Sequence, residues 1–217
     1  KWSTSSFTLD PTKNGWQQHS KKQFETNEMR FVEYFGEELK FIVTPRQLSC
    51  ENLGSASNTT INLINYDIDG NGDYGACGAR SSIVVAVIDS LSLLPWKSDR
   101  GNYGQIDYPK CVNRSRPNSY FTFDGNAAGR DNMRDFLNNV VENGNYVLVY
   151  SVSNGQFESW TNEHYEALER LGATRVRTVP NNFPYIFLAK KGFPEFAEEV
   201  IGTTSTSIIS LQRELIS

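Results

Sequence analysis

The 217-residue sequence lacks the features of several large classes of protein. No apolar run approaches the roughly 18 residues that a membrane-spanning helix needs, so we expect no membrane span. Lys and Arg number 21 against 25 Asp and Glu, and the formal net charge of −4 argues against nucleic acid as a partner. Nucleic-acid-binding proteins concentrate basic side chains on one face. The first residue is Lys1, and we expect a mature form or a segment of a longer protein.

Residues that carry chemistry are also scarce. The two histidines are His19 and His164. We expect His164, in the first turn of a predicted helix, to be an exposed polar side chain rather than a base. The sequence contains no Gly-x-Ser-x-Gly elbow, phosphate-binding loop, dinucleotide fingerprint or His-Glu-x-x-His motif. We therefore predict that the protein is not an enzyme and has no catalytic residues.

The three cysteines, Cys50, Cys77 and Cys111, are widely spaced and form no paired-ligand motif, which argues against a zinc site. Their odd number leaves two states open. Either one internal disulfide is accompanied by one thiol, or all three are free thiols.

The clearest pattern runs from Gly144 to Gly192. Residues 146–152 are apolar at successive positions, which predicts a strand that is buried on both faces. A helix follows with Thr161 as its N-cap, and Gly172 supplies its left-handed end. Trp160 and Tyr165 flank the cap with the spacing of a hydrophobic staple. Other strands are predicted near 83–89, 119–124, 174–179 and 184–189.

A second helix is predicted from Asp131 to Asn143. Its apolar residues recur with the spacing of one helical face, which predicts that the helix lies on the sheet. They are Met133, Phe136, Leu137, Val140 and Val141.

These elements resemble, in their order, the interleukin-like EMT inducer domain. The resemblance covers roughly residues 75–192. It rests on the 83–89 strand, on Phe121-Thr122-Phe123-Asp124 with its final Phe-Asp, on the helix end 167–173 and on the closing strand 185–192. Two features depart from the family. Gly78-Ala79-Arg80 replaces its Gly-Arg-Gly, and a long insert, 90–119, replaces its short hairpin.

The predicted fold class is α+β, with a mixed central β-sheet, two packed helices and a preceding β-rich accessory segment. The sheet would include antiparallel neighbours, as the resemblance implies. We expect three regions. They are a β-rich segment over 1–66, the interleukin-like EMT inducer-like domain over 67–192 with its insert at 90–119, and a C-terminal extension over 193–217.

The resemblance also implies a function. The family domain occurs in large secreted bacterial proteins and in the stem of an O-mannose N-acetylglucosaminyltransferase, where it binds a sugar of the N-acetylglucosamine type. We therefore predict a non-catalytic carbohydrate-binding module that is secreted or at the cell surface. Sugar sites combine amide and carboxylate groups with an aromatic face. The nominated residues are Asp124, Asn126, Asn154, Trp160, Asn182 and Tyr185.

An alternative partner is a surface protein rather than a glycan. The insert 90–119 carries Trp96, Tyr103 and Tyr108, and aromatic side chains are frequent anchors of protein interfaces. In this hypothesis the chain is a docking or structural module that takes no small ligand.

One loop suggests a metal. Asp67, Asp69, Asn71 and Asp73 alternate along the chain, and Gly72 occupies the sixth position, as in the first half of a calcium loop. Gly78 stands where the twelfth-position Glu is expected. Two interpretations stay open, a Ca²⁺ site that a remote carboxylate completes and a tight turn.

Overall fold

The computed structural model describes the backbone of residues 7–10, 15–18, 29–35, 38–43, 45–52, 59–63, 81–97, 103 and 120–217. Side chains are described for 45–52, 81–97, 103 and 120–217. Backbone contacts divide the chain into a smaller unit, essentially residues 1–45, and a larger unit, essentially residues 46–215. The sequence predicts region boundaries near 66 and 192, whereas the compact units separate near residue 45.

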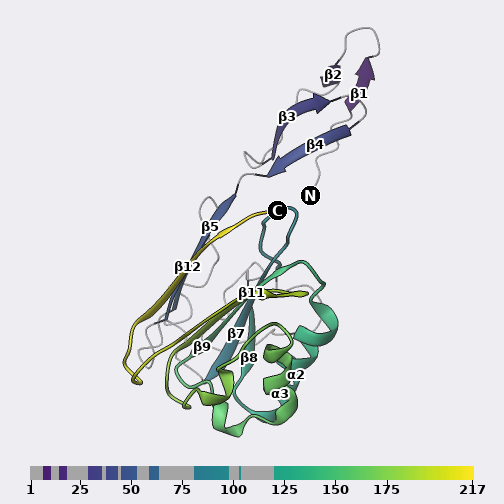
Figure 1. The fold of residues 1–217 in the computed structure, drawn as a ribbon. Helices are drawn as coiled ribbons and strands as arrows, with labels where there is room; N and C mark the ends of the chain where they lie inside the picture. The colour runs from purple at the N-terminus through teal and green to yellow at the C-terminus, as the bar shows by residue number, and fades with distance from the viewer. Residues whose placement is uncertain are drawn as a thin grey trace, which may run out of the picture. The chain divides into compact units, whose positions relative to one another are not determined.

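The smaller unit contains two antiparallel strand pairs, β1 (Phe7–Asp10) with β2 (Gly15–Gln18) and β3 (Met29–Phe35) with β4 (Glu38–Val43). Within its described residues, the larger unit contains two sheets and two α-helices (Figure 1). Its regular elements are β5 (Arg46–Asn52), β6 (Thr59–Leu63), β7 (Ser82–Ile88), β8 (Phe121–Asp124), α2 (Ala127–Asp135), β9 (Tyr146–Val152), α3 (Asn162–Glu169), β10 (Tyr185–Lys190), β11 (Phe193–Ile201) and β12 (Ile209–Leu215).

The main sheet has five strands in the order β11-β10-β9-β7-β8, so the α+β class is confirmed. Every pair in this sheet is antiparallel, whereas a mixed sheet was predicted. The difference has a topological cause. Along the sequence, α2 connects β8 to β9, and these two strands run in the same direction. In the sheet they are not neighbours, because β7 lies between them and pairs with both.

The central strands are buried on both faces, as their continuous apolar sequences predict. Alternate residues of β7 and β9, such as Val85 and Val149, join the core beneath the two helices. Their neighbours, such as Val84 and Leu148, are equally buried on the opposite face. A three-stranded sheet, β12-β5-β6, lies on that side (Figure 1). The larger unit therefore has three layers, helices, main sheet and second sheet.

Asn52 joins the second sheet to the main sheet. Its buried amide donates to the carbonyl of Ser151 at 2.8 Å and to that of Tyr185 at 3.3 Å. These carbonyls lie at one end of the β9–β10 pair, just beyond the last paired residues. The β5 strand thus satisfies polar groups that the main sheet leaves open.

Helix α2 begins earlier than predicted and continues as a π-helical turn, Phe136–Val140. The predicted apolar face is confirmed, because Met133, Phe136 and Leu137 are buried. The carbonyls at the end of this segment find a side-chain partner. Lys191 Nζ donates to Leu137, Asn138 and Val141 at 2.7, 3.0 and 2.6 Å, and burial lowers the pKa of this lysine. A cation at a helix C-terminus is also favoured by the helix dipole.

Helix α3 confirms the predicted ends. Thr161 is its N-cap, and the rings of Trp160 and Tyr165 lie 5.5 Å apart as a staple. Gly172 has φ of +108°, and the next N–H, of Ala173, donates to Leu168 O at 3.1 Å. This is the left-handed helix ending that a residue without a side chain allows.

The predicted strand over 174–179 is wrong. This segment contains a 3-10 turn, Val176–Thr178, and the fifth strand of the main sheet is β11 instead. The carboxylate of Glu199 accepts from the N–H groups of Thr174 and Arg175 at 2.7 and 2.9 Å. In a strand these two N–H groups would donate to a neighbouring strand, but here the Glu199 side chain on β11 accepts from them. In the described residues no helix is long and apolar enough to cross a membrane.

Candidate functional site

Three loops meet at one edge of the main sheet, and we call residues 124–126, 153–158 and 180–182 the edge loops. They meet because of strand direction. Strands β8 and β9 both run antiparallel to β7, so both end at this edge, and β10 runs antiparallel to β9, so it begins here. The Gly155 N–H donates to Asn181 O at 3.1 Å, which joins two of the loops directly.

Carboxamide side chains shape each edge loop. Asn126 caps α2 by accepting from the Gly129 N–H at 2.8 Å. Asn154 accepts from the Gln156 N–H at 2.7 Å. Asn181 makes two bonds to Glu158, accepting from its N–H at 2.8 Å and donating to its carboxylate at 3.0 Å. The first two loops are therefore held by carboxamides of their own, and Asn181 joins the third loop to the middle one.

The middle loop also has an uncommon backbone. Ser153 has φ of +57° and Gln156 has φ of +50°, the left-handed region that residues other than glycine seldom adopt. Such conformations persist when surrounding contacts hold them, and they cluster at functional sites. The contacts here are the Asn154 and Asn181 bonds and a bond from Trp160 Nε1 to Gly155 O at 3.1 Å.

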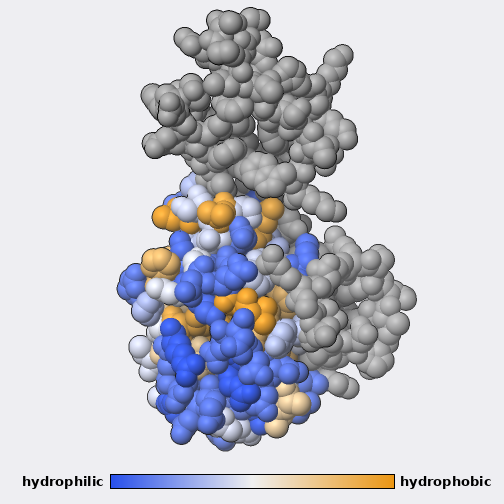
Figure 2. All heavy atoms as spheres, turned by 90° about the vertical axis from the view of Figure 1, so that its right-hand side faces the viewer, coloured by the Kyte–Doolittle hydropathy of each residue, from blue (hydrophilic) through white to orange (hydrophobic). Residues whose placement is uncertain are grey.

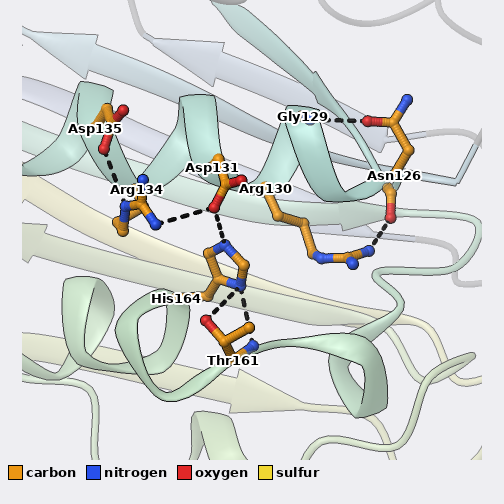
Figure 3. A network of polar contacts seen from close by, with 9 residues as sticks. Asn126, Gly129, Arg130, Asp131, Arg134, Asp135, Thr161 and His164 are labelled. Atoms are coloured by element: carbon orange, nitrogen blue, oxygen red, sulfur yellow. Dashed lines mark hydrogen bonds and ion pairs between the residues drawn. The ribbon is translucent and has the colours of Figure 1, made fainter.

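Arg130 connects the first two loops from helix α2. Its guanidinium donates to Gly125 O, and its Nη1 lies 3.5 Å from Gln156 Oε1. Figure 3 shows the side chain extending from α2 toward the turn that precedes the helix. No local sequence pattern marks Arg130 or Gln156, because only the fold brings residues 26 positions apart together.

The six predicted ligand residues divide into two groups. Asn126 and Asn182 are exposed on the edge loops, and Asp124 and Asn154 are partly buried there. Trp160 and Tyr185 are instead core residues, with exposed fractions of 7% and 0%. The Tyr185 hydroxyl donates to Glu199 Oε1 at 2.8 Å, and burial followed by the Glu199 charge raises its pKa. Neither ring presents a face to a ligand, because helix packing and the sheet cover both.

The predicted exposure of His164 is wrong, since the residue is only 2% exposed. Its Nδ1 accepts from the Thr161 N–H at 3.0 Å, and its Nε2 lies 3.0 Å from Asp131 Oδ1 on α2 (Figure 3). An Nδ1 that accepts leaves the proton on Nε2, which then donates to the carboxylate. The bond to His164 is the largest cause of a lowered pKa at Asp131.

The Asp131–His164–Thr161 arrangement resembles a catalytic triad only superficially. The Thr161 hydroxyl lies 3.2 Å from Nδ1, but that nitrogen already accepts from the Thr161 backbone. The same two residues form a capping box at the start of α3. The imidazole is thus committed to holding the helix end and α2 rather than to activating a hydroxyl.

The predicted protein-docking surface is only partly described. Trp96 is 6% exposed, and Tyr103 packs against Phe136 with ring centroids 5.7 Å apart. Both belong to the helix-side core or pack against it, and Tyr108 lies outside the described residues. Figure 2 shows the side of the molecule that carries α2, and hydrophilic side chains dominate its lower part.

The calcium prediction falls outside the structure, because Asp67, Asp69, Asn71 and Asp73 are not among the described residues. Where side chains are described, no group of three or more His, Cys, Asp or Glu could hold a metal ion. Of the cysteines, Cys50 is a buried free thiol, and burial raises its pKa.

Comparison of the sequence with protein-family models and with curated proteins finds no match. The resemblance to the interleukin-like EMT inducer domain therefore stays a prediction.

Proposed function

We propose that the chain is a non-catalytic carbohydrate-binding module and that the edge loops hold the sugar. The observation that supports this most is the convergence of carboxamides from three loops at one edge of the sheet. A carboxamide offers both a donor and an acceptor, as does each sugar hydroxyl. A backbone held by several internal bonds also lowers the entropy that a ligand must overcome.

The proposed mode of binding relies on hydrogen bonds more than on stacking. Trp160 and Tyr185 are buried, and the ring of Tyr165 is covered by the guanidinium of Arg177 at 4.9 Å. Exposed carboxamides and the half-buried Gln156 side chain remain for the ligand. We further propose that the module works in a secreted or cell-surface protein, where its partner is a glycan. The alternative of protein docking has less support, because Trp96 and Tyr103 pack inward.

A glycan array followed by titration with N-acetylglucosamine tests the proposal. We expect Asn182→Ala and Gln156→Ala each to weaken binding about 2- to 10-fold, the value of one net hydrogen bond. Asn139→Ala is the matched control, because Asn139 is an exposed carboxamide on the π-helical turn, away from the edge loops. The affinity of Asn139→Ala for N-acetylglucosamine should equal that of the unchanged protein. An array signal no higher than that of an unrelated acidic protein would refute the proposal.

A separate proposal concerns Ca²⁺ in the 67–73 loop. Carboxylates that lie close together repel one another, and a bound ion removes that repulsion. A ligand that binds only the folded state stabilises it by about 2.7 kcal/mol at a hundredfold excess over its dissociation constant. We expect millimolar calcium to raise the melting temperature and Asp69→Ala to abolish the increase without unfolding the protein. Superimposed melting curves in calcium and in chelator would leave the tight turn as the correct interpretation.

A further inference from the structure

His164 lies where the two helices and the edge loops are tied together, and we call the Asp131–His164–Thr161 contacts the clasp. On one side, Nε2 contacts Asp131 of α2, and the neighbouring Arg130 holds Gly125 and Gln156 of the edge loops. On the other side, Nδ1 holds the N–H of Thr161. The residue before it, Trp160, donates to Gly155 of the middle loop. Both connections from His164 therefore lead to the proposed sugar site.

The clasp requires a neutral imidazole. Only an unprotonated Nδ1 can accept from the Thr161 N–H, and a protonated ring would place two donors against each other. The ring lies at the N-terminus of α3, where the helix dipole disfavours a positive charge. Because the His164 side chain is only 3% exposed, water cannot replace the lost bond.

Some of the charges around the His164 ring favour its protonation, and others oppose it. Asp131 faces Nε2 from α2, and Glu163 is the neighbouring acid on α3, so both favour a protonated ring. Arg134 pairs with Asp131 at 2.9 Å, and Arg130 also acts on that carboxylate, so both oppose it. The Asp131 side chain is 50% exposed and already paired, which limits what a second cation adds. The loss of the capping bond is then the larger effect.

We propose that protonation of His164 opens the clasp and loosens the edge loops, so that a sugar bound there is released on acidification. The release of sugar rests on the proposed function, whereas the opening of the clasp does not. Histidine side chains change charge between about pH 8 and pH 5. The stabilisation by the clasp is present while the His164 ring is neutral and is lost when the ring takes up a proton. The stabilisation that comes from ionised Asp131 is lost only at a lower pH, because the pKa of its carboxyl is below its usual 3.8.

The sequence suggests a matched variant without a titrating ring. Glutamine is a preferred third residue of a capping box, so in His164→Gln the side-chain oxygen can accept from the Thr161 N–H at every pH. His19→Gln controls for the other histidine in the chain. Asp131→Asn removes the main charge that favours a protonated ring.

Melting temperatures at pH 7.5 and pH 5.5 test the clasp itself. We expect the unchanged protein to lose about 2–4 °C more than His164→Gln, the effect of one helix cap in a chain of this size. His19→Gln should behave like the unchanged protein, and Asp131→Asn should lose more. Nitrogen NMR of the His164 ring should show the Nε2–H tautomer at pH 7.5. Equal losses in the unchanged protein and in both His164→Gln and Asp131→Asn, or the Nδ1–H tautomer, would overturn the proposal.

Titration with N-acetylglucosamine at the two pH values tests the coupling. We expect the dissociation constant to rise about fivefold at pH 5.5 in the unchanged protein and to stay constant in His164→Gln. Binding that weakens equally in both proteins would overturn the coupling. Absence of binding at both pH values would refute the proposed function and with it the sugar release, while the melting and NMR results would still decide whether the clasp opens.

Discussion

Replacing Phe136 with alanine is expected to lower the free energy of unfolding of the larger unit by about 3–5 kcal/mol, the cost of removing a fully buried aromatic ring. Phe136 is 0% exposed and stands at the junction of α2 and the π-helical turn. Its ring lies 4.5 Å from that of Phe121 and 5.5 Å from that of Phe123, both on β8. The alanine variant would therefore leave a cavity between the π-helical turn and strand β8.

Amide hydrogen exchange of β7 and β9 is the suitable measurement, because it reports the opening of the larger unit separately from residues 1–45. Phe193→Ala is the control. Phe193 is 46% exposed, so the same chemical change should cost less than about 1 kcal/mol. Equal costs for the two variants would show that Phe136 is not part of a close-packed core.

The main sheet could be predicted because its central strands are buried on both faces. The continuous apolar residues of β7, β9 and β10 are typical of strands that are covered on both faces. The ends of α3 could be predicted for a similar reason. These ends depend on contacts between residues that are close in the sequence, so the local pattern is sufficient to predict them. The contacts are those of Thr161, of the Trp160–Tyr165 staple and of Gly172.

Elements that depend on distant partners could not be predicted. The segment 174–179 has the alternation of a strand, but Glu199 of β11 takes up its backbone donors. His164 occupies a position in the first helical turn that is usually exposed, and contacts with Asp131 of α2 and with the ring of Trp160 accompany its burial. The antiparallel character of the sheet likewise follows from β7 lying between β8 and β9, which no local pattern reveals.

The candidate site shows the same division. Asn126 and Asn154 follow predicted strand ends in the sequence, and the family resemblance together with the chemistry of sugar sites nominates them. The contribution of Arg130 depends on its reach to Gly125 and Gln156, and that of Asn181 on its bonds to Glu158. The two nominated aromatic residues, Trp160 and Tyr185, lie in the core, because a Trp or Tyr beside a loop is equally suited to pack beneath it.

Gly129→Ala is expected to have the second large effect, and it acts on the fold and the edge loops together. A Cβ at this position would lie 2.7 Å from the backbone nitrogen of Asp124 and nearer still to its carbonyl oxygen. Both obstructing atoms are backbone at the end of β8, so no side-chain rotation can relieve the overlap. Helix α2 must instead move away from the strand, at a cost of about 1–3 kcal/mol or more.

That displacement separates the two sides of the first edge loop. The Gly129 N–H is the group that Asn126 accepts from, and Arg130 is the next residue, so the helix cap and the contact with Gly125 shift with the backbone. We therefore expect Gly129→Ala to lower the melting temperature and to weaken binding of N-acetylglucosamine, measured by calorimetry. Ala128→Ser is the control at the exposed neighbouring position, where a change costs about 0.5 kcal/mol. A Gly129→Ala protein with unchanged melting temperature would contradict the close approach of α2 to β8, on which the geometry of the edge loops depends.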